Sequence, residues 1–175
     1  MVIETHPFGS FVPKNARWLV LGSFTTKEAY DEQKKFDYTW FYSNGRNQFW
    51  PILESVYGVK LKSIRDKEDL FTNLRMALAD IIYQCERRKN SNLDMHLTNI
   101  VYAIEDITRI LASKRISKIF FTSRFVETKF RSNFKEVIRR HPAIELVTLP
   151  SPSPRYAQMT LSQKIKRYNE LLPSI

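Results

Sequence analysis

The chain has 175 residues, 43% hydrophobic and 26% charged, and these fractions are typical of a single-domain globular protein. They exclude a disordered tail, a collagen and a coiled coil, and no stretch approaches the roughly 18 uncharged apolar residues that a membrane span needs. The 28 Lys and Arg residues outnumber the 18 Asp and Glu residues, which gives a net charge of +10. Such a charge attracts phosphate polyanions and favours a nucleic-acid partner over a membrane, although many basic proteins are merely soluble and basic.

The cysteine content and the N-terminus indicate the compartment. A single cysteine, Cys85, permits no internal disulfide, no cysteine-ligated zinc site and no four-cysteine iron–sulfur cluster. Residues 1–11 include Glu4 and His6 and no apolar run, so they do not resemble a secretory signal. We therefore expect an intracellular protein. No repeat, low-complexity tract or linker interrupts the chain, which predicts one domain over residues 1–175.

The predicted elements alternate between strand and helix along the chain. The apolar run 18–22 precedes a Gly-Ser turn and predicts a buried parallel strand. Residues 25–47 are polar and aromatic without a clear period, and a loop of this length usually covers a site. A helix starts near Gln48 and stops at Gly58, and residues 77–83 either extend the next helix or form a short strand. Further helices are expected at 66–76, 104–115, 125–140 and 161–172, and further strands at 117–122 and 144–149.

This alternation predicts an α/β fold with a mostly parallel sheet and helices on both faces. In such sheets, ligands bind beyond the carboxyl ends of the strands. The two loops that follow Gly22 and Leu149 are therefore the candidate sites.

The first loop opens with Gly22, Ser23 and Phe24, and it lacks the glycine spacing of dinucleotide and nucleoside-triphosphate motifs. Residues 38–51 set aromatic rings beside amides and an arginine. Rings can stack on a nucleobase and amides can read its edge, so this composition fits a nucleobase pocket. The alternative is an aromatic core segment with polar loop residues.

The second loop is rich in proline and serine. Three prolines stiffen the backbone, and two serines offer hydroxyls and amides to a phosphate. The arginine and tyrosine that follow could enter a DNA groove, whereas the structural alternative is a rigid surface turn. The candidate DNA-binding residues are Ser151, Pro152, Ser153, Pro154, Arg155 and Tyr156.

Together the two loops resemble the uracil-DNA glycosylase superfamily, in the segments 21–24, 47–53 and 149–154. Residues 80–87, followed by 91–94, also resemble the hypoxanthine-DNA glycosylase branch. The segments follow the family order and spacing over nearly the whole chain, and the run N-Q-F-W-P-I-L is the most specific of them.

The resemblance implies a three-layer α/β/α sandwich around a four-stranded, mostly parallel sheet. It implies a monomeric, cytoplasmic, nucleoid-associated enzyme that flips a damaged or mismatched base out of DNA and hydrolyses its N-glycosidic bond, with no metal or cofactor. By position, Tyr42 matches the ring that stacks on the base, and Asn47 matches the asparagine proposed for catalysis in the hypoxanthine-type branch. The segment 151–156 matches the one that presses on the minor groove. The other residues assigned to base binding are Gly22, Ser23, Phe24 and Gln48.

One position departs from the family pattern. Mismatch-specific relatives carry G-I-N-P-G in the first motif, and its asparagine positions the water, but this chain has Phe24 there, followed by Thr25 and Thr26. Either Asn47 serves catalysis, or the protein is a weak or inactive nucleic-acid-binding member of the fold. Asn47 also suits the N-cap of the helix that follows it.

The remaining candidates have a functional and a structural interpretation each. Asp31 and Asp37 are carboxylate helpers or solvated loop charges, and the basic residues 87–89 contact phosphate or form a solvated loop. Cys85 lies in an apolar segment and is expected in the core rather than as a nucleophile. The three histidines are far apart in the sequence and show no ligand spacing. A nucleoside-processing enzyme on the same fold is a further alternative, which no phosphate-binding loop supports.

Overall fold

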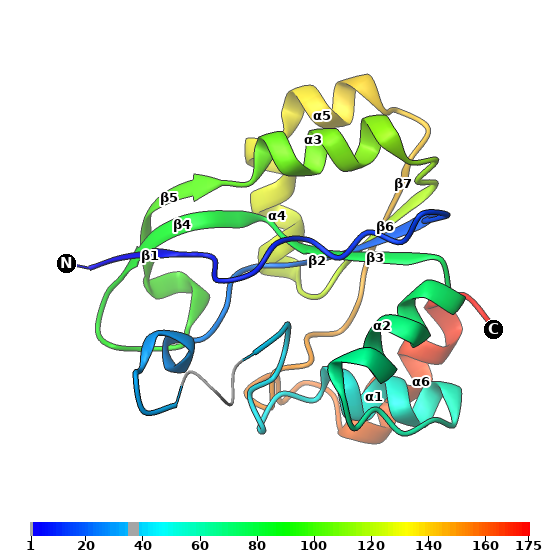
Figure 1. The fold of residues 1–175 in the computed structure, drawn as a ribbon, viewed down its shortest axis with the longest axis horizontal. Coiled ribbons are helices and arrows are strands. Elements are labelled where there is room, and N and C mark those ends of the chain that lie inside the picture. The colour runs from blue at the N-terminus through cyan, green and yellow to red at the C-terminus, as the bar shows by residue number, and fades with distance from the viewer. Residues whose placement is uncertain (1, 35–38) are drawn as a thin grey trace.

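The larger sheet has four strands, all parallel, in the order β3-β2-β6-β7 (Figure 1). The computed structural model that shows it describes residues 2–34 and 39–175. The predicted four-stranded parallel sheet is confirmed. Its strands are β2 (Trp18–Gly22), β3 (Met76–Asp80), β6 (Lys118–Phe121) and β7 (Glu145–Thr148).

Helices cover both faces of this sheet, because its buried strands carry apolar side chains on each side (Figure 1). Leu19 and Leu21 of β2 join one core, whereas Val20 between them joins the other. The resulting three layers are the predicted α/β/α arrangement. The first core is closed by α3 (Ile104–Ser113), α4 (Arg124–Asn133) and α5 (Lys135–Arg140), the second by α1 (Phe49–Tyr57), α2 (Ile64–Asn73) and α6 (Leu161–Leu171).

The helix ends follow the local sequence closely. Gly58 ends α1 in the left-handed conformation, as expected of a helix stop. The prediction of one helix over 66–76 is wrong at both ends, because Ser63 caps α2 earlier and residues from Met76 onward form β3. The helix expected over 125–140 is two helices, because Phe134 leaves the helical conformation between α4 and α5 while its ring stacks on Phe130.

A second sheet, which the sequence did not predict, extends from the end of β3. It is antiparallel, in the order β1-β4-β5, and consists of β1 (Ile3–Thr5), β4 (Ile82–Arg87) and β5 (Leu97–Tyr102). Only Ile81 separates β3 from β4, and its N–H donates to the carbonyl of Gly22 at 2.9 Å. Residues 77–83 are thus parts of two strands, one in each sheet.

Two short 3₁₀ helices lie in the loops, η1 (Lys27–Tyr30) after β2 and η3 (Asp94–His96) before β5. No helix in the described part of the chain is long and apolar enough to cross a membrane.

Candidate functional site

The carboxyl ends of the four parallel strands share one edge of the sheet, at Gly22, Asp80, Phe121 and Thr148. The loops that follow them are therefore neighbours, as the sequence predicted for those after Gly22 and Leu149.

Gly22 is the point of closest approach at this edge. A Cβ atom on Gly22 would overlap both the hydroxyl oxygen of Tyr42 and Oδ1 of Asp80. A side chain here would have to displace both groups, so the glycine lets a phenol and a carboxylate approach the end of β2.

Tyr42 reaches this point from the long aromatic loop. Its hydroxyl donates to Oγ1 of Thr122 at 3.3 Å, and its ring lies against Phe49 with the centroids 4.2 Å apart. Burial raises the pKa of the phenol, so Tyr42 stays a neutral donor. Its φ of 54° is in the left-handed region, where a bulky residue is strained, and strained residues cluster at functional sites.

Asn47 closes the same loop with its side chain bound to the first turn of α1. Its Oδ1 accepts the N–H of Phe49 at 2.9 Å. The predicted N-cap position is wrong, because Gln48 is the N-cap of α1 and makes no side-chain capping bond. Asn47 stands one residue earlier and uses its amide oxygen to bind the first residue of the helix. Because this bond orients the amide group, the NH₂ of Asn47 remains the end that can donate to a ligand.

Gln48 joins this loop to the proline-rich loop. Its backbone N–H donates to the carbonyl of Pro152 at 2.9 Å, and its Oε1 accepts from Nζ of Lys164 at 2.8 Å. The same Nζ donates to the carbonyl of Ser153 at 2.9 Å. Lys164 is 1% exposed, and burial lowers its pKa. One buried lysine of α6 thus ties both predicted segments together.

The rest of the proline-rich loop turns toward solvent. Ser151 Oγ accepts the N–H of Ser153, and Ser153 Oγ accepts the N–H of Arg155, both at 3.3 Å. Pro154 and Arg155 are exposed, whereas the Tyr156 ring lies 5.4 Å from Nζ of Lys164. The loop is a rigid turn with an exposed tip, a geometry that fits both interpretations of its sequence.

His6 and Asp80 form an ion pair at the edge that the sequence did not reveal. Nε2 of His6 lies 2.8 Å from Oδ2 of Asp80, and Nδ1 lies 2.6 Å from the carbonyl of Phe8. The two side chains are 8% and 7% exposed. Phe24 contributes to the enclosure, because its ring meets that of His6 edge-on and stacks on Tyr30. Phe24 is therefore part of the wall around the ion pair.

Ser23 makes the next contact along this loop. Its hydroxyl donates to Oδ1 of Asp94 at 2.8 Å. Burial raises the pKa of Asp94 to about 6, with a further contribution from the charge of Asp80, although the bond from Ser23 opposes the shift. A carboxyl group that titrates near neutral pH beside a strand end is a typical feature of a functional site.

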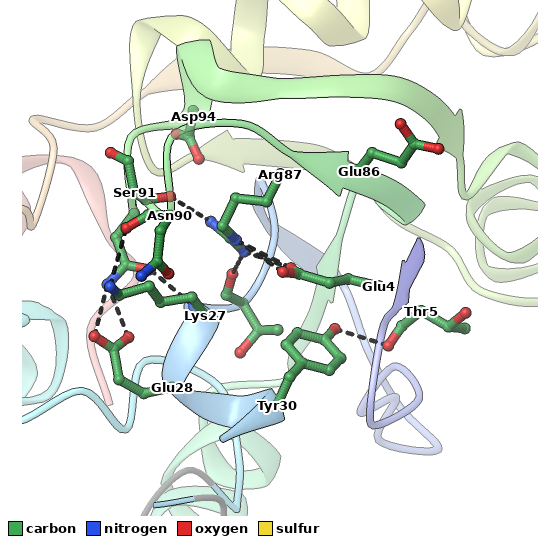
Figure 2. Close-up of polar contacts among 12 residues, drawn as sticks. Glu4, Thr5, Lys27, Glu28, Tyr30, Glu86, Arg87, Asn90, Ser91 and Asp94 are labelled. Carbon is green, nitrogen blue, oxygen red and sulfur yellow. Dashed lines mark hydrogen bonds and ion pairs between the residues drawn. The ribbon is translucent and has the colours of Figure 1, made fainter. Parts of the chain in front are cut away.

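The altered loop after Phe24 is held by a polar network around Arg87 (Figure 2). Arg87 pairs with Glu4 at 2.8 Å, and its guanidinium also donates to the carbonyls of Thr25 and Ser91. The Arg87 and Glu4 side chains are 5% and 13% exposed. The sequence suggested that residues 87–89 either contact phosphate or form a solvated loop. Both interpretations are wrong for Arg87, because its guanidinium is buried and already bonded to protein groups.

The other candidates lie apart from this edge or outside the described residues. Oδ1 of Asp31 accepts the N–H of Gln33 in an exposed turn, and Asp37 lies outside the described residues. Cys85 is buried, and burial raises its thiol pKa to about 11, which confirms it as a core residue. Across residues 2–34 and 39–175, no three His, Cys, Asp or Glu side chains gather in a way that could hold a metal ion.

Comparison with known proteins identifies the class of fold. No protein-family model and no curated protein sequence matches the chain. A solution NMR structure from Methanosarcina acetivorans, described as a "putative Uracil DNA glycosylase", is similar to it. The TM-score is 0.68 over 97% of this chain and 96% of that one, at 18% sequence identity. The protein thus has the α/β/α fold of that structure, with helices on both faces of a four-stranded parallel sheet.

Proposed function

We propose that the protein is a DNA glycosylase that flips a deaminated base, uracil or hypoxanthine, out of DNA and hydrolyses its N-glycosidic bond. The observation that carries this proposal is that the aromatic loop and the proline-rich loop are bonded to each other at the carboxyl edge of the sheet. The backbone N–H of Gln48 donates to the carbonyl of Pro152, and Nζ of Lys164 donates to Gln48 and to Ser153. The description of the Methanosarcina acetivorans structure, whose fold matches over nearly the whole length, supports the same class.

In this proposal Asn47 assists the departure of the base. The bond between a base and deoxyribose breaks through an oxocarbenium-like state, in which negative charge develops on the leaving base. The NH₂ of Asn47 donates a hydrogen bond to an oxygen of that base, and the bond from Phe49 to its Oδ1 fixes its direction. An amide transfers no proton at neutral pH, so Asn47 stabilises and orients rather than acting as an acid.

Tyr42 and the proline-rich loop bind the DNA in this proposal. Phe49 covers one face of the Tyr42 ring, and the extruded base stacks on the other. The exposed tip at Pro154 and Arg155 approaches the minor groove, where a rigid turn can press without losing conformational entropy.

A nucleic-acid-binding protein that keeps the fold and has weak or no catalysis is the second candidate. The observation that favours it is the position of Phe24, which stacks on Tyr30 and faces His6 where relatives have a water-positioning asparagine. An apolar ring cannot orient water.

The test is an excision screen with uracil, hypoxanthine, xanthine and thymine, each in matched and mismatched duplexes, read out as strand cleavage in alkali. We expect excision of uracil or hypoxanthine by the wild-type protein and its loss in Asn47→Asp. Salt-sensitive binding of every duplex without excision would instead establish the second candidate.

A further inference from the structure

A basic cavity of about 410 Å³ lies at the amino ends of the strands, on the edge of the sheet opposite the candidate site. Three parts of the chain form it: the segment that leads into β2, the turn before β3 and the end of α3. The lining residues are Lys14, Asn15, Ala16, Arg17, Arg75, Ser113, Lys114 and Arg115.

Five of these eight lining residues are lysine or arginine, and none is acidic. Across residues 2–34 and 39–175, no carboxylate forms an ion pair with any of the five. Some cations elsewhere on the surface do have carboxylate partners: Arg131 pairs with Glu127, and Arg167 pairs with Glu170. The cavity therefore concentrates positive charge that the fold leaves uncompensated.

The end of α3 explains only part of this cluster. Cations near a helix C-terminus stabilise its dipole, and Lys114 also donates to the carbonyl of Lys14 at 3.2 Å. This accounts for Lys114 and Arg115 but not for Arg17 or Arg75, which belong to other elements.

Arg75 occupies a position where glycine would fit the backbone better. It follows the end of α2 with a φ of 55°, and its N–H donates to the carbonyl of Thr72 at 3.0 Å. This is the left-handed residue after a helix, for which glycine has no steric penalty. Its carbonyl accepts the N–H of Arg17 at 2.7 Å, which holds the two arginines together. The backbone conformation alone favours glycine at this position, so the helix end does not account for the arginine.

We propose that this cavity, called here the amino-edge pocket, binds phosphate groups of a nucleic-acid backbone. Clustered cations without carboxylates suit a ligand that carries several negative charges. β2 has five residues, which span about 16 Å, so a straight duplex at the carboxyl edge cannot also fill this pocket. The pocket therefore takes a second segment of the backbone. This goes beyond the proposed function and does not depend on base excision.

The test compares two triple variants with equal net charge in binding to an undamaged duplex. The pocket variant carries Arg17→Gln, Arg75→Gly and Arg115→Gln, and the control carries Lys60→Gln, Lys62→Gln and Lys135→Gln, at exposed lysines outside the pocket. We expect the pocket variant alone to bind more weakly at low salt. Its plot of log affinity against log salt should be shallower by about 0.9 for each phosphate that the pocket no longer neutralises. Equal losses of affinity in both variants would overturn the proposal, because net charge would then explain them.

Arg75→Gly alone separates binding from folding. Glycine relieves the left-handed strain, so we expect an unchanged or higher Tm together with weaker duplex binding. Unchanged binding would contradict the proposal.

Inorganic phosphate distinguishes the source of the ligand. If it raises the Tm of wild type but not of the pocket variant, while both triple variants bind the duplex equally, the pocket takes small phosphates and the nucleic-acid assignment is wrong.

Discussion

His6 and Asp80 lie 74 positions apart in the sequence, yet Nε2 of the histidine and Oδ2 of the aspartate are 2.8 Å apart at the carboxyl edge of the sheet. The other ring nitrogen of His6 faces the carbonyl of Phe8. A carbonyl and a carboxylate both accept hydrogen bonds, so this geometry favours the imidazolium form of His6, in which both ring nitrogens donate. Burial opposes this charge, but the hydrogen bond and charge of Asp80 outweigh it, and the pKa of His6 is raised. The site therefore contains a buried ion pair whose cation comes from the N-terminus.

The first prediction is that stability falls as pH rises from about 4 to 8. In the folded protein the pKa of Asp94 is raised from 3.8 to about 6. Ionising Asp94 therefore costs more free energy in the folded than in the unfolded protein, and this loss of stability develops as pH rises between the two values. The pKa of His6 is raised above 6.5, so its contribution is complete below about pH 6.5 and is lost as pH rises through its folded value. Thermal unfolding across this range measures both effects.

Two variants assign this pH dependence. Asp94→Asn should flatten the profile between about pH 4 and 6, and His6→Gln should flatten it above about pH 6.5. A wild-type Tm that rises over the same range would contradict both assignments.

The second prediction concerns the close approach at Gly22. Gly22→Ala places a methyl group against the Tyr42 hydroxyl and the Asp80 carboxylate, so we expect a loss of about 1–3 kcal/mol in the free energy of unfolding. Gly45→Ala is the control, because nothing lies within 4 Å of the added atom. Urea denaturation of both variants measures the difference, and equal stability would refute the close packing.

The third prediction tests the ring of Tyr42. If a base stacks on it, Tyr42→Ala should weaken binding to a duplex with a damaged base by about 1–3 kcal/mol more than binding to an undamaged one. Tyr42→Phe keeps the ring and loses only the 3.3 Å bond to Thr122, so it should retain this preference. Fluorescence anisotropy with the two duplexes measures it, and equal losses would point to a structural role.

The fourth prediction separates the two ends of the Asn47 amide. Asn47→Asp keeps an oxygen for the N–H of Phe49 but has no NH₂, so stability should stay normal while single-turnover excision falls by orders of magnitude. Asn47→Ala should lose excision and also about 1 kcal/mol of stability, because it removes the oxygen that accepts the N–H of Phe49. Excision by Asn47→Ala at the wild-type rate would exclude Asn47 from catalysis.

The fifth prediction concerns the lysine that joins the two loops. Lys164→Met leaves Oε1 of Gln48 and the carbonyl of Ser153 without their donor, which should reduce stability by about 1–3 kcal/mol. Residues 151–156 should then exchange their amide hydrogens faster. Lys166→Met is the matched control on the exposed side of α6, and it should change neither property.

The sequence predicted the larger sheet and most helices because those elements carry strong local signals. The run 18–22 is apolar throughout, and Gly58 marks a helix end, so β2 and α1 were identified correctly. The antiparallel sheet was missed because its strands mix polar and apolar residues. In β4, Tyr83 is exposed and Cys85 is buried, and the register shifts along β4 and β5 disturb the alternation further.

The site was predictable only where its residues lie close together in the chain. Asn47 and Gln48 stand in one motif, and in the structure Gln48 bonds to Pro152 of the proline-rich loop. His6 and Lys164 carry no such signal. Each is an isolated polar residue whose partner comes from a distant segment, so only tertiary structure reveals its role.

The position of β1 makes the site sensitive to local opening. This strand has three residues, lies at the edge of its sheet and pairs with β4. It is held further by the ion pair of Glu4 with Arg87 and by the hydrogen bond from the Tyr30 hydroxyl to the carbonyl of Thr5. Short edge strands open at a lower free energy than a sheet core. Opening of β1 would separate Glu4 from the buried guanidinium of Arg87, and His6, which pairs with Asp80, follows the strand directly. The contacts of this short N-terminal strand therefore help to position groups that lie far along the chain at the carboxyl edge.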